Sequence, residues 1–185
     1  VRVISRPALW RGALWLPYRR DPAALRDAVA EAKRLATLTT EHDFDAIMCH
    51  ADVTGASMNE RFQARDGLDP ELFRVRSAHR RASEKETTEK ETSESVAPSI
   101  PTYTGHYHKP HVIAEPLAKG RYIRYAGTPY QTSMAEAGQQ KALLVLDRSR
   151  GWAVDEEIAL DLGPRQALLL APLLTLTLAL TLTLP

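Results

Sequence analysis

A helix followed directly by a buried strand constrains the fold of this chain more than any other feature of its sequence. Asp21 is a good N-cap and Pro22 a good first helical residue, and apolar residues then recur at helical spacing as far as Ala36. The apolar run Phe44–Cys49 has the length of a buried strand and ends at His50. This order is an α/β pattern, and in open α/β sheets ligands bind beyond the carboxyl ends of the strands.

The second half of the chain is predicted to be mostly β-strand, because short apolar or alternating runs are separated there by turn residues. With 185 residues the chain is long enough for one domain with a sizeable core. The predicted strands are 1–5, 13–16, 44–49, 102–104, 111–114, 122–126, 141–147 and 152–160. We therefore expect a single α/β domain over residues 1–164.

Two segments stand apart from this domain. Residues 83–95 contain no large apolar side chain and cannot bury enough surface to offset their ordering entropy, so a disordered insertion is expected at 74–99. A phosphorylated or partner-binding tract is the alternative there. Residues 165–185 form a Leu/Thr-rich tail whose period-2 alternation and Pro172 favour a low-complexity end, or a product of faulty gene assembly, over a membrane span.

Charge and cysteine content narrow the functional classes. The formal net charge of +1 gives no indication of a nucleic-acid-binding surface. Cys49 is the only cysteine, so no internal disulfide can form, which fits a reducing compartment. With no signal peptide at the start, these features predict an intracellular, cytoplasmic protein that is not expected at a membrane.

Histidines supply the candidate metal ligands. The loop Gly105-His106-Tyr107-His108 can aim two imidazoles at one metal ion or at two adjacent ions, and Gly105 is expected to allow a tight turn or a positive φ. Imidazole suits Zn, Mn and Fe ions, and a catalytic centre of the zinc type needs at least three protein ligands. His50, His106 and His108 are the candidates. The alternatives are a histidine-rich surface loop and, for His50, a structural histidine.

Four runs together resemble a known family. They are Phe44–Ala56, Gly105–His108, Tyr125–Gln131 and Glu136–Lys141. In the first run, His50-Ala51-Asp52 comes directly after the predicted strand. In this order they resemble the calcineurin-like metallophosphoesterase superfamily. The last two runs look like the branch of that superfamily that includes DNA-repair exonucleases.

The resemblance implies a sandwich of two β-sheets flanked by helices, and a hydrolase of phosphomonoesters or phosphodiesters that uses two divalent ions (Mn, Fe or Zn). Nuclease activity is among the activities of that branch, although the charge gives it no support. Carried over residue by residue, His50 and His106 would bind one ion and His108 the other. Tyr107 and His111 match no ligand position, and Tyr107 is expected to serve in packing.

Three motifs of that superfamily are missing from this sequence. It contains no D-x-H, no G-D-x-x-D and no G-N-H-D/E, so the catalytic residues and the bridging carboxylate are expected upstream of Val1. We therefore expect a C-terminal portion of the sandwich that exposes a sheet edge or an apolar face, dissolves poorly, and on its own cannot build the dinuclear centre or turn over substrate. The alternative is a non-catalytic binding or interaction domain that retains the fold.

Overall fold

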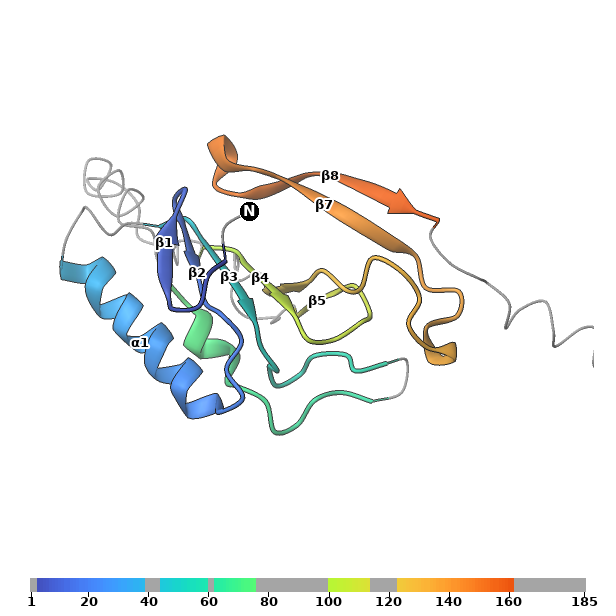
Figure 1. Ribbon diagram of the computed structural model, residues 1–185, viewed down its shortest axis with the longest axis horizontal. Helices are drawn as coiled ribbons and strands as arrows, with labels where there is room; N and C mark the ends of the chain where they lie inside the picture. Colours follow the sequence, from blue (N-terminus) through green and yellow to red (C-terminus); the bar gives the residue numbers. More distant parts are fainter. Residues whose placement is uncertain (1–2, 39–43, 60–61, 76–99, 114–122, 162–185) are drawn as a thin grey trace, which may run out of the picture.

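The computed structural model of the chain describes residues 3–38, 44–59, 62–75, 100–113 and 123–161. Within these ranges, one α-helix, eight strands and three short 3-10 helices form an α/β arrangement (Figure 1). The strands are β1 (Ala8–Trp10), β2 (Ala13–Trp15), β3 (Ala46–His50), β4 (Thr102–Gly105), β5 (His111–Ile113), β6 (Ile123–Tyr125), β7 (Lys141–Asp147) and β8 (Ala153–Leu160). The helices are α1 (Pro22–Leu38), η2 (Pro70–Phe73), η3 (Met134–Glu136) and η4 (Arg148–Arg150).

Six of the strands form one mixed sheet in the order β1-β2-β3-β4-β6-β5. The four central strands β2, β3, β4 and β6 run parallel, whereas β1 and β5 pair antiparallel with their neighbours at the two edges. At the carboxyl ends of β3 and β4, His50 lies opposite Gly105 in the ladder. The histidine loop therefore leaves the sheet beside His50.

Helix α1 covers one face of this sheet. Its buried residues Leu25 and Val29 belong to the same apolar cluster as Leu14, Ile47 and Ile123, which occupy matching register positions on β2, β3 and β6. This packing buries the first part of the apolar stripe that the sequence of the helix predicts, and so stabilises α1 against the sheet.

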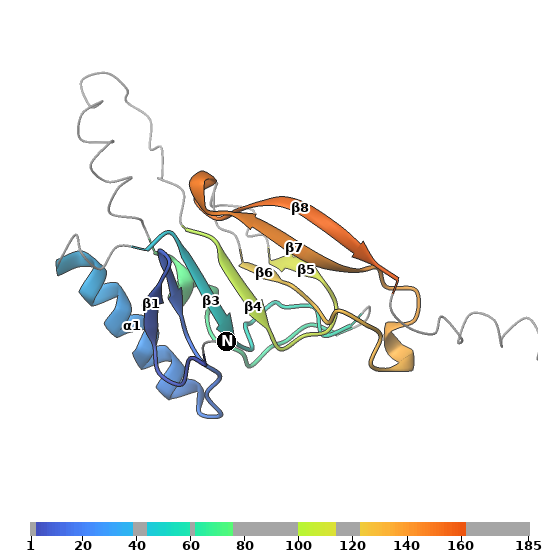
Figure 2. The same ribbon diagram turned by 45° about the horizontal axis from the view of Figure 1, so that its top comes forward.

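The antiparallel pair β7–β8 lies over the opposite face (Figure 2). The hydroxyl of Tyr103 on β4 donates a hydrogen bond to the carbonyl oxygen of Trp152 at 2.5 Å, and Arg124 on β6 pairs with Glu157 on β8 at 2.6 Å. The predicted α/β class is confirmed, with a mixed sheet between one helix and a second, two-stranded sheet.

The prediction was wrong at the start of the chain. Residues 3–5 form no strand, and an unpredicted strand, β1, pairs instead with β2. The two are joined by Arg11 and Gly12, whose φ angles of 55° and 74° are both positive, as a two-residue type I′ hairpin turn requires. A left-handed arginine in that turn is not a common hairpin signal, which is why the sequence did not reveal β1.

The segments that the sequence set apart fall mostly outside the described residues. This holds for the expected tail at 165–185 and for 76–99 of the expected insertion. The first part of that expected insertion belongs to the fold, because Val75 is buried and its carbonyl oxygen accepts a hydrogen bond from the Ile100 N–H at 2.9 Å. In the described ranges, no helix has both the length and the apolar character needed to cross a bilayer.

Candidate metal centre

The parallel pairing of β3 and β4 brings two of the candidate ligands together. His50 ends β3 and His106 follows β4, and the centroids of their rings lie 5.4 Å apart at an interplanar angle of 88°. The rings of His50 and Tyr18 also form a T-shaped pair, again with 5.4 Å between centroids. Two imidazoles from distant parts of the sequence therefore lie side by side at one end of the sheet.

Gly105 makes this approach sterically feasible. A Cβ at position 105 would lie 2.7 Å from Nδ1 of His50, closer than real Cβ contacts allow. The expected positive φ is not at Gly105, however. It belongs to His106, whose φ is 103°, a region that costs a residue with a side chain roughly 1–3 kcal/mol. The glycine provides space for the neighbouring ring, and the strain falls on the candidate ligand itself.

His50 is biased toward its neutral form. Burial lowers its pKa below the ordinary value, and proximity to His106 lowers it further. Metal ions bind the neutral imidazole, so a lowered pKa reduces competition from protons. The environment of His50 thus suits a ligand role.

A hollow of about 210 Å³ lies beside these two rings. Two arginines and the amino-terminal end of α1 border it, together with two aspartates. The residues that line it are Tyr18, Arg19, Arg20, Pro22, Leu25, His50, Ala51, Asp52, Asp66, Gly67, Leu68 and His106. The lining thus combines basic side chains, Arg19 and Arg20, with the acidic Asp52 and Asp66.

His108 has other neighbours. Its Nδ1 lies 3.0 Å from Oε1 of Glu136 and 2.8 Å from Oγ1 of Thr132, and its ring is about half exposed (51%). The carbonyl oxygen of His108 accepts hydrogen bonds from Nζ of Lys141 at 2.9 Å and from the Thr128 N–H at 3.1 Å. Both the backbone and the ring of this residue are therefore anchored.

The anchor is a buried ion pair that sequence analysis did not identify. The side chains of Glu136 and Lys141 are 5% and 4% exposed, and Oε2 of Glu136 lies 2.7 Å from Nζ of Lys141. Burial would raise the pKa of Glu136, but hydrogen bonds from Lys141, Thr132, His108 and Ser133 outweigh it and lower that pKa below the ordinary value. In the sequence, Glu136–Lys141 is one of the runs that carry the family resemblance, and nothing in that run indicates burial of the pair.

The turn that follows β6 also supports the loop. Gly127 has a positive φ of 76°, and a Cβ there would lie 2.8 Å from the carbonyl oxygen of His108 and 2.7 Å from Cγ of Pro110. The two downstream runs, Tyr125–Gln131 and Glu136–Lys141, therefore both contact His108 and hold it in place.

Tyr107 and His111 have structural positions. Tyr107 is buried in the core cluster, and its hydroxyl donates a hydrogen bond to Oδ1 of Asp52 at 2.6 Å; burial, followed by this bond, raises its pKa. The ring of His111 stacks on Tyr125, and its Nε2 accepts a hydrogen bond from the Ser57 N–H at 2.9 Å. The prediction that Tyr107 serves in packing is confirmed.

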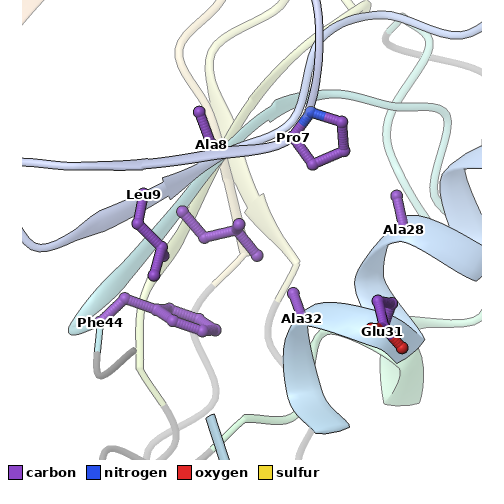
Figure 3. A pocket seen from close by; sticks show the side chains of 8 residues that line it. Pro7, Ala8, Leu9, Ala28, Glu31, Ala32 and Phe44 are labelled. Carbon is purple, nitrogen blue, oxygen red and sulfur yellow. The ribbon is translucent and has the colours of Figure 1, made fainter. Parts of the chain in front are cut away.

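A separate apolar pocket lies between β1 and α1 (Figure 3). It measures about 140 Å³, and among the described residues that line it Glu31 is the titratable one. The side chain of Glu31 is paired with Arg34 at 2.7 Å. None of the described residues that line this pocket is a candidate metal ligand.

The donor set fits divalent ions in part. His50 and His106 offer two adjacent imidazoles, a donor type that Zn, Mn and Fe accept. Across the described ranges, no group of three or more His, Cys, Asp or Glu side chains is arranged to hold a metal ion. A centre at these histidines would therefore need further donors besides those of the described residues.

The sequence matches no protein-family model and no curated protein. The relationship to the calcineurin-like superfamily, and the roles it implies for the three histidines, remain predictions.

Proposed function

We propose that this chain is part of a metal-dependent phosphoesterase in which His50 and His106 hold one divalent ion and His108 contributes to a second. The observation that carries the proposal is the 5.4 Å approach of the His50 and His106 rings across the tips of two parallel strands. The edge beyond those tips is where α/β folds bind their ligands. The separate environment of His108 is consistent with a second ion.

Divalent ions at such a centre would lower the pKa of a water molecule and neutralise charge on the phosphoryl oxygens. The chain itself would supply the imidazoles and the means to hold the ester. Arg19 and Arg20 line the hollow beside His50 and His106, and guanidinium groups bind phosphate oxygens well. Arg19 already donates a hydrogen bond to the carbonyl oxygen of Ser5 at 3.0 Å, so Arg20 is the better candidate for contact with substrate.

Zinc titration of the purified chain tests the ligand assignment. Calorimetry should detect a site that His50→Ala or His106→Ala weakens at least about tenfold, since each removes one of two imidazoles. His111→Asn is the matched control, because it removes an imidazole whose nitrogens bond Ser57 and Lys109. Equal zinc affinity in the wild type and both alanine variants would contradict the assignment.

Phosphate binding then tests the substrate class. Inorganic phosphate should bind the zinc-loaded chain, and Arg20→Ala should weaken it several-fold without changing zinc affinity. We expect no turnover of bis-p-nitrophenyl phosphate with Mn by this chain alone, because its described ligand set does not reach three at either ion. Metal-dependent turnover would show that the chain holds a complete centre and would contradict this ligand count.

A non-catalytic binding or interaction domain is the second candidate function. The lack of a three-ligand group among the described residues favours it. In that case neither zinc nor phosphate should bind at His50 and His106, and substitution of either histidine should change neither affinity.

A further inference from the structure

We propose that the buried Glu136–Lys141 pair fixes the His108 ring as the Nδ1–H tautomer, which leaves Nε2 free to take a metal ion. Glu136 is thereby a positioning residue for His108. The tautomer follows from the hydrogen bonds alone, whereas its use as a metal ligand rests on the proposed function.

The first step is the charge of Glu136. Its carboxylate accepts hydrogen bonds from Lys141 at 2.7 Å, from Ser133 at 3.0 Å and from Thr128 at 3.1 Å, and it also accepts one from the Thr132 hydroxyl. A carboxyl group among this many donors is held in the ionised form, which can only accept. Oε1 therefore presents a lone pair, and no proton, to the ring of His108.

The second step concerns Thr132. Its hydroxyl has one hydrogen, and that hydrogen is donated to Glu136. Its oxygen, at 2.8 Å from Nδ1 of His108, can then only accept. Nδ1 thus faces two acceptor oxygens, so it must carry the proton, shared between Oε1 of Glu136 and Oγ1 of Thr132.

The third step is the position of the ring. Lys141, held by Glu136, also donates to the carbonyl oxygen of His108 at 2.9 Å, so one ion pair fixes both the backbone and the ring of the same residue. A carboxylate that accepts from one nitrogen of a histidine orients the other nitrogen and increases its basicity toward a metal. Lys141 and Glu136 together give His108 the orientation and the tautomer of a ligand.

Nitrogen-15 NMR of the ring tests the proposal on the wild-type, metal-free chain. At pH 8 we expect the His108 spectrum to show a protonated Nδ1 and an unprotonated Nε2. In Glu136→Gln, Lys141 should keep the amide oxygen as its acceptor, which turns the NH₂ group toward His108 and requires Nδ1 to accept. The tautomer should therefore switch to Nε2–H. Glu157→Gln, which makes the same substitution at an exposed carboxylate paired with Arg124, should leave His108 unchanged.

A wild-type spectrum with the proton on Nε2 would overturn the proposal whether or not any variant folds. An unchanged tautomer in Glu136→Gln would overturn the role of Glu136. Thr132→Val is a second variant, and it should retain the Nδ1–H tautomer because Glu136 still accepts.

Zinc titration followed on the His108 signals separates this proposal from the function that it rests on. We expect Glu136→Gln to weaken zinc binding at His108 by about 10–100-fold, the usual cost of losing a carboxylate behind a histidine ligand. If the tautomer is as proposed but zinc moves no His108 signal in the wild type, the proposed role of His108 at a second ion fails and the tautomer assignment stands.

Discussion

The two histidine environments at the ends of β3 and β4 are built by different means. The pair His50/His106 owes its geometry to the backbone: a parallel ladder, a missing Cβ at Gly105 and a strained φ at His106. His108 owes its geometry to side chains, above all to the buried Glu136–Lys141 pair.

This difference teaches where each environment is vulnerable. A backbone-built pair should tolerate changes in distant side chains but not an added Cβ at the ladder. A ring held by a buried ion pair should tolerate small changes in the volume of neighbouring side chains, but not the loss of one of the two charges. The predictions below test that contrast.

Lys141→Met should have the largest effect on stability. It leaves the carboxylate of Glu136 buried without its cation, a situation that costs about 3–5 kcal/mol. Urea unfolding should show this loss, and the double variant Lys141→Met with Glu136→Gln should recover part of it because no uncompensated charge remains. A single variant as stable as the wild type would mean that the pair is not buried as described.

Gly105→Ala should disrupt the backbone-built pair. The new Cβ would displace the ring of His50, whose Nδ1 would be 2.7 Å away, and zinc affinity at the pair should fall at least about tenfold, or about 1.4 kcal/mol. Gly55→Ala is the control, because it adds backbone strain at a φ of 88° but meets no atom within 4 Å. Equal zinc affinity in Gly105→Ala and the wild type would remove Gly105 from the site.

Position 106 should be more stable as glycine than as alanine. At a φ of 103°, alanine is strained and glycine is not, so His106→Gly should unfold at higher urea than His106→Ala, by about 1 kcal/mol. Both variants lack the imidazole, so the comparison isolates the backbone. The reverse order of stability would show that residue 106 is not held in this conformation.

Acid should destabilise the fold slightly through two histidines. Burial lowers the pKa of both His50 and His111 below 6.5 in the folded chain. As the pH falls through 6.5 the unfolded chain takes up protons first. The stability that the two histidines contribute is therefore fully present above that pH and is lost below it. The urea concentration at the unfolding midpoint should decrease when the pH is lowered from 7.5 to 5.5. The decrease should be smaller in the double variant His50→Asn with His111→Asn. An equal fall in that variant would assign the effect to other groups.

The sequence predicted those features that depend on local pattern. The apolar spacing of α1 and the run that becomes β3 placed His50 at a strand end, and the strand before Gly105 placed His106 at another. Parallel neighbours then bring the two imidazoles to the same edge, which is the arrangement observed. This part of the site could be predicted because the period of the apolar residues and the ends of the strands are visible in short stretches of the sequence.

The remaining features depend on contacts that no local pattern encodes. The burial of Glu136 and Lys141 arises from the packing of the turn after β6 against the start of β7, and charged residues are ordinarily assigned to the surface. The positive φ lies at His106 and not at Gly105, although glycine is the residue that ordinarily adopts it. The hairpin of β1 and β2 depends on a left-handed arginine, which sequence preferences disfavour.

The phenol of Tyr125 ties the loop after β3 to β6, which lies two strands away in the same sheet. Its hydroxyl accepts from the amide of Val53 at 3.0 Å and donates to the carbonyl of Ala51 at 2.9 Å. The loop that carries Asp52 to the hollow cannot open without breaking both hydrogen bonds to Tyr125, so we expect the amide of Val53 to be protected in hydrogen exchange. A ligand that binds beside His50 would therefore contact a loop that is already held in place, and binding would not have to order that loop first.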